Sequence, residues 1–250
     1  MSDPWIALRA TTRARIGLGR TGDALPIREI LEFQLAHARA RDAVHTPLDT
    51  AAIAKAIAPL ASVIVASRAI DRDTYLRRPD LGRQLDPTCR DLLSGTWDAV
   101  FVIADGLSPV AVQRHAAPLL RACLARLQGW SVAPIVIATR ARVALGDEIG
   151  ALLQAQLCAV LIGERPGLSA ADSLGVYLTY QPRIGRRDSE RNCISNIHAD
   201  GLSYGAAADM LAWLMTEARH RKLTGVDLKD DRVPAVRSFP GQSRGPDRLG

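Results

Sequence analysis

The stretch WDAVFVIADGLSPVAVQRHAAPLLRACL, residues 97–124, predicts how most of the chain folds. Its apolar run at residues 99–104 is rich in Val, Ile and Phe, as in a strand that is buried on both faces. Ser108 then supplies a helix N-cap, and Pro109 takes the first helical position, where a missing N–H costs nothing. The helix is expected to end at Gly129 and to bury one face, formed by Ala116, Leu120, Cys123 and Leu127. A strand that runs directly into such a helix is the building unit of parallel α/β sheets.

The same alternation of apolar runs and helical periodicity continues downstream. It predicts further strands at residues 134–139, 159–162, 175–180 and 192–197. A helix is expected from about Gly146, with Asp147 and Glu148 in its first turn, and a last helix opens at Ser203. Strands and helices in this order predict an α/β fold with a Rossmann-like parallel sheet.

The residues before the sheet have a different pattern. An irregular arm is expected over residues 1–25, then an amphipathic helix over residues 27–45 and an alanine-rich helix over residues 51–58, with Asp49 or Thr50 as its N-cap. Residues 62–66 fit a strand and a helix equally well, and residues 68–87 are expected to form loop and short turns. A helix is expected from Pro87 through Leu93.

These patterns divide the chain into three parts. Residues 1–95 are predicted to form a smaller, mainly helical N-terminal region, and residues 96–230 a Rossmann-like domain. Residues 231–250 contain several prolines and glycines and little apolar sequence, so this tail is predicted to be disordered.

Composition narrows the class of protein. With 48% hydrophobic and 23% charged residues the chain is globular, and its apolar runs are too short to span a membrane. The four cysteines, Cys89, Cys123, Cys158 and Cys193, are far apart, which argues against a zinc site and a disulfide framework. Free thiols and the lack of a signal peptide favour the cytoplasm.

The net charge of +6 suits a phosphate-bearing ligand, an acidic partner or nucleic acid. The basic residues form no long block, and neither an aromatic stacking platform nor a known DNA-binding motif accompanies them. A solvated surface is therefore the preferred interpretation, and no nucleic-acid partner is expected.

Two motifs match known ligand sites only in part. The segment at residues 17–22 fits GxGxxG, but no buried strand precedes it and no helix follows at once, as dinucleotide binding requires. The segment at residues 196–201 resembles the DxHxxG motif of cobalamin proteins that bind cobalt through histidine. Asn196 stands where that motif has its aspartate, so His198 is interpreted as a polar loop residue.

Two further sets of residues are candidates for a metal site or a catalytic triad. His37, Arg41 and His45 share one helical face, but Arg41 argues against a metal, and an exposed or partner-facing stripe is the preferred interpretation. The serines of the chain lack a GxSxG elbow, so a hydrolase triad has no support.

A more specific signal is spread over the predicted strand ends. Segments 105–108, 142–147 and 163–168 each follow a strand, and segment 191–196 overlaps the last one. Ligands of open parallel sheets bind outside the carboxyl ends of the strands. The glycines there would let backbone approach a ligand, although turn geometry explains each glycine equally well. The sequence predicts a ligand site at this edge.

The same segments carry a family resemblance. The motifs are VALGDEIG at residues 143–150, GERPGL at 163–168, DSL at 172–174, CISNIH at 193–198, IADGLS at 103–108, LGRTG at 18–22 and RRPDLGR at 77–83. Together they resemble the small subunit of ethanolamine ammonia-lyase over roughly residues 11–226.

The resemblance implies an ammonia-lyase that deaminates ethanolamine and related vicinal amino-alcohols to acetaldehyde, or another oxo compound, and ammonia by a radical mechanism. It implies that adenosylcobalamin lies between this chain and a barrel-shaped large subunit, with the coenzyme's own base on cobalt. The large subunit would supply the substrate pocket. Activity is therefore expected only in a hetero-oligomer of large–small pairs, and no catalytic side chain is expected in this chain.

Carried over position by position, the coenzyme contacts fall on Val143, Glu164 and Cys193. Val143 can pack against an apolar corrin face, and Glu164 can accept hydrogen bonds from the corrin amides. The alternatives are a capping or ion-pairing role for Glu164 and a buried apolar role for Cys193.

Some members of the family carry a long N-terminal extension that targets a bacterial microcompartment. Here the recognisable sequence starts almost at once, so a free cytoplasmic enzyme is expected. Two other classes of protein are alternatives: a stand-alone nucleotide-binding module that uses the edge near Gly106 and Gly163, and a nucleic-acid binder.

Overall fold

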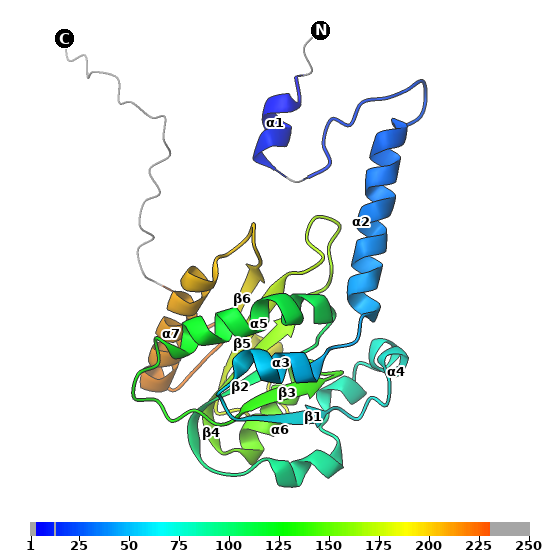
Figure 1. The fold of residues 1–250 in the computed structure, drawn as a ribbon. Coiled ribbons are helices and arrows are strands. Elements are labelled where there is room, and N and C mark those ends of the chain that lie inside the picture. The colour runs from blue at the N-terminus through cyan, green and yellow to red at the C-terminus, as the bar shows by residue number, and fades with distance from the viewer. Residues whose placement is uncertain (1–3, 13, 231–250) are drawn as a thin grey trace, which may run out of the picture.

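The computed structural model describes residues 4–12 and 14–230 of the chain. A six-stranded sheet of order β1-β3-β2-β4-β5-β6 forms the centre of the body (Figure 1). Its strands are β1 (Ser62–Ala66), β2 (Trp97–Ala104), β3 (Ile135–Thr139), β4 (Ala155–Gly163), β5 (Leu174–Tyr180) and β6 (Asn192–Ile197). The expected α/β class is confirmed, and the tail predicted to be disordered lies outside the described residues.

One strand of the sheet corrects the expectation of parallel pairing throughout. Strands β1 to β4 run parallel, whereas β5 is antiparallel to both of its neighbours, β4 and β6. Residues 164–173, between β4 and β5, contain no helix that could carry the chain back across the sheet, so β5 pairs as the return arm of a hairpin. Because β6 reverses again, it points in the same direction as β4.

Helices cover both faces of the sheet (Figure 1). The core of one face includes residues of α3 (Thr50–Ile57), α5 (Pro109–Leu124) and α7 (Tyr204–Arg221). The core of the other face includes residues of α6 (Leu145–Leu152). Alternate residues of β2 enter the two cores, because successive side chains of a strand point to opposite faces.

The predicted helix caps are present. The Ser108 hydroxyl accepts a hydrogen bond from the Ala111 amide at 3.2 Å, and Asp49 caps α3 through the Ala52 amide at 2.9 Å. The end of α5 is a correction, because the helix stops at Leu124 and a turn leads from there to Gly129.

The N-terminal region contains more regular structure than expected. The predicted arm includes α1 (Ile6–Thr11), and the predicted loop after β1 includes α4 (Arg72–Arg77) and η1 (Leu81–Arg83). The helix expected from Pro87 is present as the 3₁₀ helix η2 (Pro87–Leu92). Asp71 caps α4 by accepting from the Thr74 amide at 2.7 Å. Residues 62–66 form β1, which pairs with β3 although it lies before residue 96. The division of the chain into domains stays a prediction.

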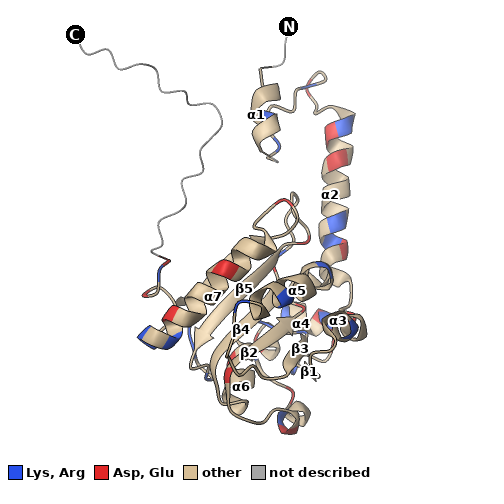
Figure 2. Ribbon diagram, turned by 60° about the vertical axis from the view of Figure 1, so that its left-hand side comes forward, with Lys and Arg blue, Asp and Glu red and all other residues tan. Residues whose placement is uncertain are grey.

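The helix α2 (Ile27–His45) has the predicted bounds and rises away from the sheet (Figures 1 and 2). Only Ala43, near its end, is buried. Its apolar stripe is open to solvent, since Ile27, Leu31 and Leu35 are 72%, 57% and 51% exposed. This apolar face has no cover within the described part of the chain.

Candidate functional site

The crevice that an α/β sheet offers to ligands lies between β2 and β3. The chain leaves β2 toward α5 on one face and leaves β3 toward α6 on the other, which makes this point a topological switch. Asp105 occupies it. Its carboxylate accepts hydrogen bonds from the amides of Gly106, Arg140 and Ala141 at 2.9, 2.7 and 2.8 Å, and it pairs with Arg72 at 3.3 Å.

Beside Asp105 an open cavity of about 460 Å³ lies among the loops at the carboxyl edge. Its lining comes from α4, from the ends of β2, β3 and β4 with the loops that follow them, and from the middle of β5: Tyr75, Gly106, Leu107, Arg142, Val143, Ile162, Gly163, Glu164, Arg165 and Tyr177. The edge predicted from the strand ends therefore does carry a cavity.

The floor of this cavity includes a cation–π sandwich. The guanidinium carbons of Arg72 and Arg142 lie 4.7 and 4.4 Å from the centroid of the Tyr75 ring, which is fully buried. The Tyr75 hydroxyl donates to the Ala141 carbonyl at 3.2 Å, and burial raises its pKa, so it stays neutral. The sandwich holds the backbone and side chain at Arg142 in place, directly before Val143.

Glu164 is half-buried at the cavity wall. Its Oε2 accepts a hydrogen bond from the Ser173 hydroxyl and a longer one, at 3.3 Å, from the Asn196 amide. Among the described residues no hydrogen-bond donor and no ion-pair partner reaches Oε1. Neither the capping nor the ion-pairing alternative for Glu164 applies, and one of its oxygens is open to a donor from outside.

Tyr177 connects the cavity to Cys193. Tyr177 and Cys193 are paired across β5 and β6, and Tyr177 lines the cavity. Burial, together with the Cys193 thiol and the Glu164 carboxylate, raises the pKa of Tyr177 to about 12. The Tyr177 hydroxyl therefore remains a neutral hydrogen-bond donor. Cys193 itself is exposed rather than buried, so the apolar alternative does not hold for it.

The structure thus brings two of the three predicted residues, Val143 and Glu164, into one cavity, and joins Cys193 to it through Tyr177. Sequence reasoning missed Tyr75 and Tyr177. Tyr75 lies in a segment expected to be loop, and no sequence signal marked it. Tyr177 could have been found by pairing the last two strands, which would set it opposite Cys193.

The glycines of this edge serve a purpose other than ligand approach. A Cβ atom on Gly163 would lie 2.1 Å from the Ser108 carbonyl oxygen, and one on Gly106 would lie 2.2 Å from the Gly163 oxygen. The Leu107 amide donates to Gly163 O at 2.9 Å. These glycines let the loop after β2 contact the end of β4, so the backbone geometry of the turn explains them.

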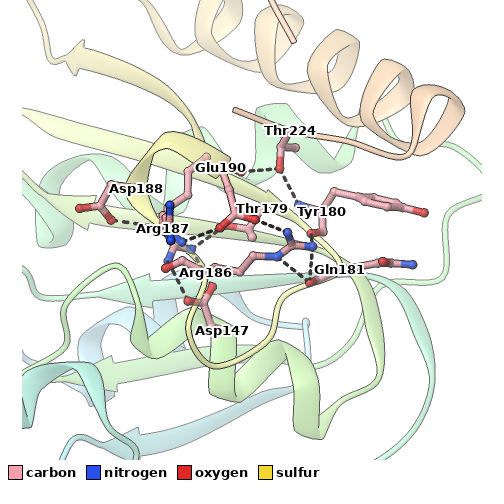
Figure 3. Close-up of polar contacts among 10 residues, drawn as sticks. Asp147, Thr179, Tyr180, Gln181, Arg186, Arg187, Asp188, Glu190 and Thr224 are labelled. Atoms are coloured by element: carbon pink, nitrogen blue, oxygen red, sulfur yellow. Dashed lines mark hydrogen bonds and ion pairs between the residues drawn. The ribbon is translucent and has the colours of Figure 1, made fainter. Parts of the chain in front are cut away.

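A buried ion pair fixes the hairpin that carries Cys193. Arg191 donates to both carboxylate oxygens of Asp147 at 2.6 and 2.7 Å and to Thr179 at 2.9 Å. Figure 3 shows Thr179 in the middle of this network, with Arg186 beside it and Asp147 below. Asp147, which was expected to stabilise the helix dipole at the start of α6, therefore also ties α6 to the segment that begins β6.

The two partial motifs do not form ligand sites. No strand precedes Gly17 in the described part of the chain, and Gly17 lies against Trp5 instead. His198 accepts from the Asp200 amide through Nδ1 at 3.3 Å, so Nε2 carries the proton and donates to Asn196 Oδ1 at 2.9 Å. Both ring nitrogens are used within the loop. Within the described residues, no group of three His, Cys, Asp or Glu side chains could hold a metal ion.

The fold and the cavity define a class: an α/β protein with a mostly parallel, Rossmann-like sheet and an open cavity at the carboxyl edge of that sheet. No helix in the described residues has the length and apolar character needed to cross a membrane. The particular family follows from comparison with known proteins. The family model "Ethanolamine ammonia-lyase light chain (EutC)" matches residues 2–229, so the chain belongs to this family.

Relatives agree over almost the whole chain. The chain is 52% identical to the ethanolamine ammonia-lyase small subunit of Azotobacter vinelandii, over 96% of this chain and 94% of that protein. It is 52% identical to the small subunit of Pseudomonas aeruginosa and 53% identical to that of Xanthomonas campestris pv. campestris, over 92% of this chain and 88% of each relative. The resemblance found in the motifs is confirmed.

Proposed function

We propose that this chain is the small subunit of an adenosylcobalamin-dependent ethanolamine ammonia-lyase and that the cavity at the carboxyl edge holds part of the coenzyme. Membership of the light-chain family over residues 2–229 carries this proposal. The family's reaction is the B12-dependent deamination of ethanolamine. The site residues we propose for the coenzyme are Val143, Glu164 and Cys193.

The residues of the cavity fit the chemistry of a corrin, which is a wide plate with apolar faces and a rim of amides. Val143 offers an apolar wall, and the open Oε1 of Glu164 offers an acceptor for an amide N–H. A cavity of about 460 Å³ has room for one part of such a large molecule. A second polypeptide is therefore needed to cover the rest.

The state of His198 supports binding with the coenzyme's own base on cobalt. Both of its nitrogens are engaged by Asn196 and Asp200 inside their loop, so the imidazole is not free to replace that base. When bound, the coenzyme supplies a carbon radical for hydrogen abstraction. The residues of this chain bind and orient it and help to exclude water, and none of them is proposed to act on the substrate.

The partner that we propose is the large subunit, in a hetero-oligomer of large–small pairs, with the amino-alcohol bound by that partner. The relatives are named small subunits, which implies a larger companion. Several large apolar side chains between residues 5 and 35 are exposed, which supports a contact surface for the large subunit in this segment. They are Trp5, Ile6, Leu8, Leu25, Ile27, Leu31, Phe33 and Leu35. A cytoplasmic location is supported by the four free cysteines. Encapsulation in a microcompartment is the alternative.

The decisive experiment is reconstitution with a large subunit. We expect acetaldehyde and ammonia from ethanolamine only when both subunits and adenosylcobalamin are present, and no product from this chain alone. Full activity of the large subunit without this chain would refute the proposal.

Substitutions then test the site. Glu164→Ala and Cys193→Trp should each weaken coenzyme binding by the complex roughly tenfold or more, because the first removes a hydrogen-bond acceptor and the second fills the rim of the cavity with a bulky side chain. Glu164→Gln and Cys193→Ala are the matched controls, since each keeps the shape of its site. Binding is measured by spectroscopic titration and folding by thermal melting. Unchanged titrations for both disruptive variants would mean that the site lies elsewhere.

A further inference from the structure

Two arginines line the coenzyme cavity without a carboxylate to neutralise them. Arg142 and Arg165 both contribute to the cavity wall, and Glu164 is its only acidic residue. The Glu164 carboxylate is held by Ser173 and by the Asn196 amide. Within the described residues, no carboxylate lies within ion-pair distance of either arginine. The cavity wall therefore carries an excess of positive charge.

Arg142 is also unsatisfied as a hydrogen-bond donor. Its Nε is buried and has no hydrogen-bond partner, and its Nη2 makes only a long contact of 3.4 Å with the Tyr75 carbonyl. Nη1 of Arg142 donates to no described residue, so an acceptor on a ligand in the cavity can bind there and meet this unused hydrogen-bonding capacity. The charge and the open donor belong to the same side chain.

The position of Arg142 is fixed in advance of binding. Its guanidinium carbon lies 4.4 Å from the centroid of the buried Tyr75 ring, and its amide donates to the Gly82 carbonyl at 2.8 Å. The carboxylate of Asp105 is paired with Arg72 and with three backbone amides, which leaves Arg142 without that counter-charge. A rigid guanidinium of this kind loses little entropy on binding a planar or tetrahedral oxyanion.

We propose that Arg142, assisted by Arg165, forms an anion-binding subsite for the phosphodiester in the nucleotide loop of the coenzyme. This inference rests on the proposed function. The phosphodiester is the only anionic group of adenosylcobalamin, because the corrin side chains are neutral amides. Arginine binds phosphate oxygens through parallel N–H donors, and such charge-assisted bonds are the strong ones. The subsite would hold the nucleotide side of the coenzyme against this chain.

The test compares corrinoids with and without the phosphate, bound to the complex of both subunits. Adenosylcobalamin is titrated beside adenosylcobinamide, which lacks the nucleotide loop, and beside adenosylcobinamide phosphate, which restores the anion. Arg142→Gln should weaken adenosylcobalamin and the cobinamide phosphate roughly tenfold or more and leave adenosylcobinamide within about twofold. Wild-type binding of the anionic corrinoids should also weaken with salt more steeply than that of the variant.

Three further variants keep the result interpretable. Arg142→Lys retains the charge without the fork and should lose less affinity than Arg142→Gln. Arg165→Gln changes an exposed side chain, so it tests the subsite even where loss of Arg142 disturbs the Tyr75 sandwich. Arg83→Gln removes the same charge from the neighbouring cavity beneath α6 and should leave all three affinities unchanged.

The outcomes separate the subsite from the proposed function. If the wild-type complex binds no corrinoid, the proposed function fails. If it binds all three, and Arg142→Gln and Arg165→Gln weaken them equally or not at all, the phosphate subsite alone is refuted. A wild-type complex that binds ATP or inorganic phosphate tightly through these arginines, without competition from adenosylcobalamin, would also overturn it.

Discussion

A single buried carboxylate, that of Asp105, holds the ends of β2 and β3 together. It accepts hydrogen bonds from the amides of Arg140 and Ala141, which directly follow β3, and from the guanidinium of Arg72 on α4. Burial raises the pKa of Asp105, and the three amides and Arg72 oppose that rise. This residue fills the switch-point crevice, so the ligand cavity opens beside it and toward β4.

Gly163 offers a test of how closely the loops at this edge approach each other. Gly163→Ala would set a Cβ atom 2.1 Å from the Ser108 oxygen and 2.7 Å from the Asp105 oxygen, both of which are backbone atoms that cannot rotate away. We expect a loss of about 1–3 kcal/mol in the free energy of unfolding, as for other overpacked sites. Urea denaturation measures it.

Gly167→Ala is the matched control in the next loop. Its Cβ atom would meet only the Ala170 backbone, at 3.5 Å and beyond, which is ordinary contact. The control should unfold like the wild type. Equal stability of Gly163→Ala and the wild type would show that the loop after β2 does not contact β4 this closely.

At the scale of elements, α2 differs from every helix that covers the sheet. Helices α5 and α7 each bury an apolar face in the core, whereas the stripe on α2 is exposed along most of its length. A helix that is amphipathic but uncovered is typical of a surface that a partner buries.

Substitutions on α2 test this contact. Leu31→Asp and Leu35→Asp should each raise the dissociation constant for the large subunit roughly tenfold or more, because burial of one leucine contributes about 1.5–3 kcal/mol. Surface plasmon resonance with an immobilised large subunit measures it.

The control for α2 lies on the charged side of the same helix. Glu32→Gln breaks an exposed pair with Arg28, at 2.8 Å, which contributes little. It should leave the association unchanged. If the aspartate variants bind the large subunit like the wild type while self-association of the isolated chain falls, the stripe contacts a second copy of the chain instead.

The whole molecule should lose stability in mild acid through His115. This buried residue joins α5 to α7, with Nδ1 2.7 Å from the Tyr204 hydroxyl and Nε2 3.6 Å from Asp172. Burial lowers the pKa of His115 below its ordinary value of 6.5, and Asp172 opposes that shift. The unfolded chain therefore takes up the proton first. The contribution of neutral His115 to the free energy of unfolding is fully present above pH 6.5, and it decreases as the pH falls below that value.

Urea denaturation over the range from about pH 8 to pH 5 tests this expectation. For the wild type, His115 should add a slope of up to about 1.4 kcal/mol per pH unit below pH 6.5, and His115→Gln should remove it. If the free energy of unfolding changed with pH in the same way for both proteins, His115 would take up its proton equally well in the folded and the unfolded state.

Local signals in the sequence predicted most elements of the fold. The caps at Asp49, Ser108 and Ser203 mark the starts of three helices, because each side chain accepts a hydrogen bond from the amide three residues onward. The loops after the strands also pointed to the ligand edge. They did not reveal the antiparallel strand β5, since pairing direction depends on the connection to the preceding strand and not on the strand's own residues.

The site divides in the same way. The sequence by itself determined which residues stand at the strand ends, including Val143 and Glu164, and the motifs that place the chain in its family. Only the tertiary structure decided that Tyr75 underlies Arg142 and that Tyr177 links Glu164 to Cys193. Asp105 and the Ala141 amide are 36 residues apart, and such contacts form only once the strands have found their order in the sheet. A sequence pattern over a few residues reports which local backbone conformation those residues prefer. A cavity depends on which distant segments the packed core brings together.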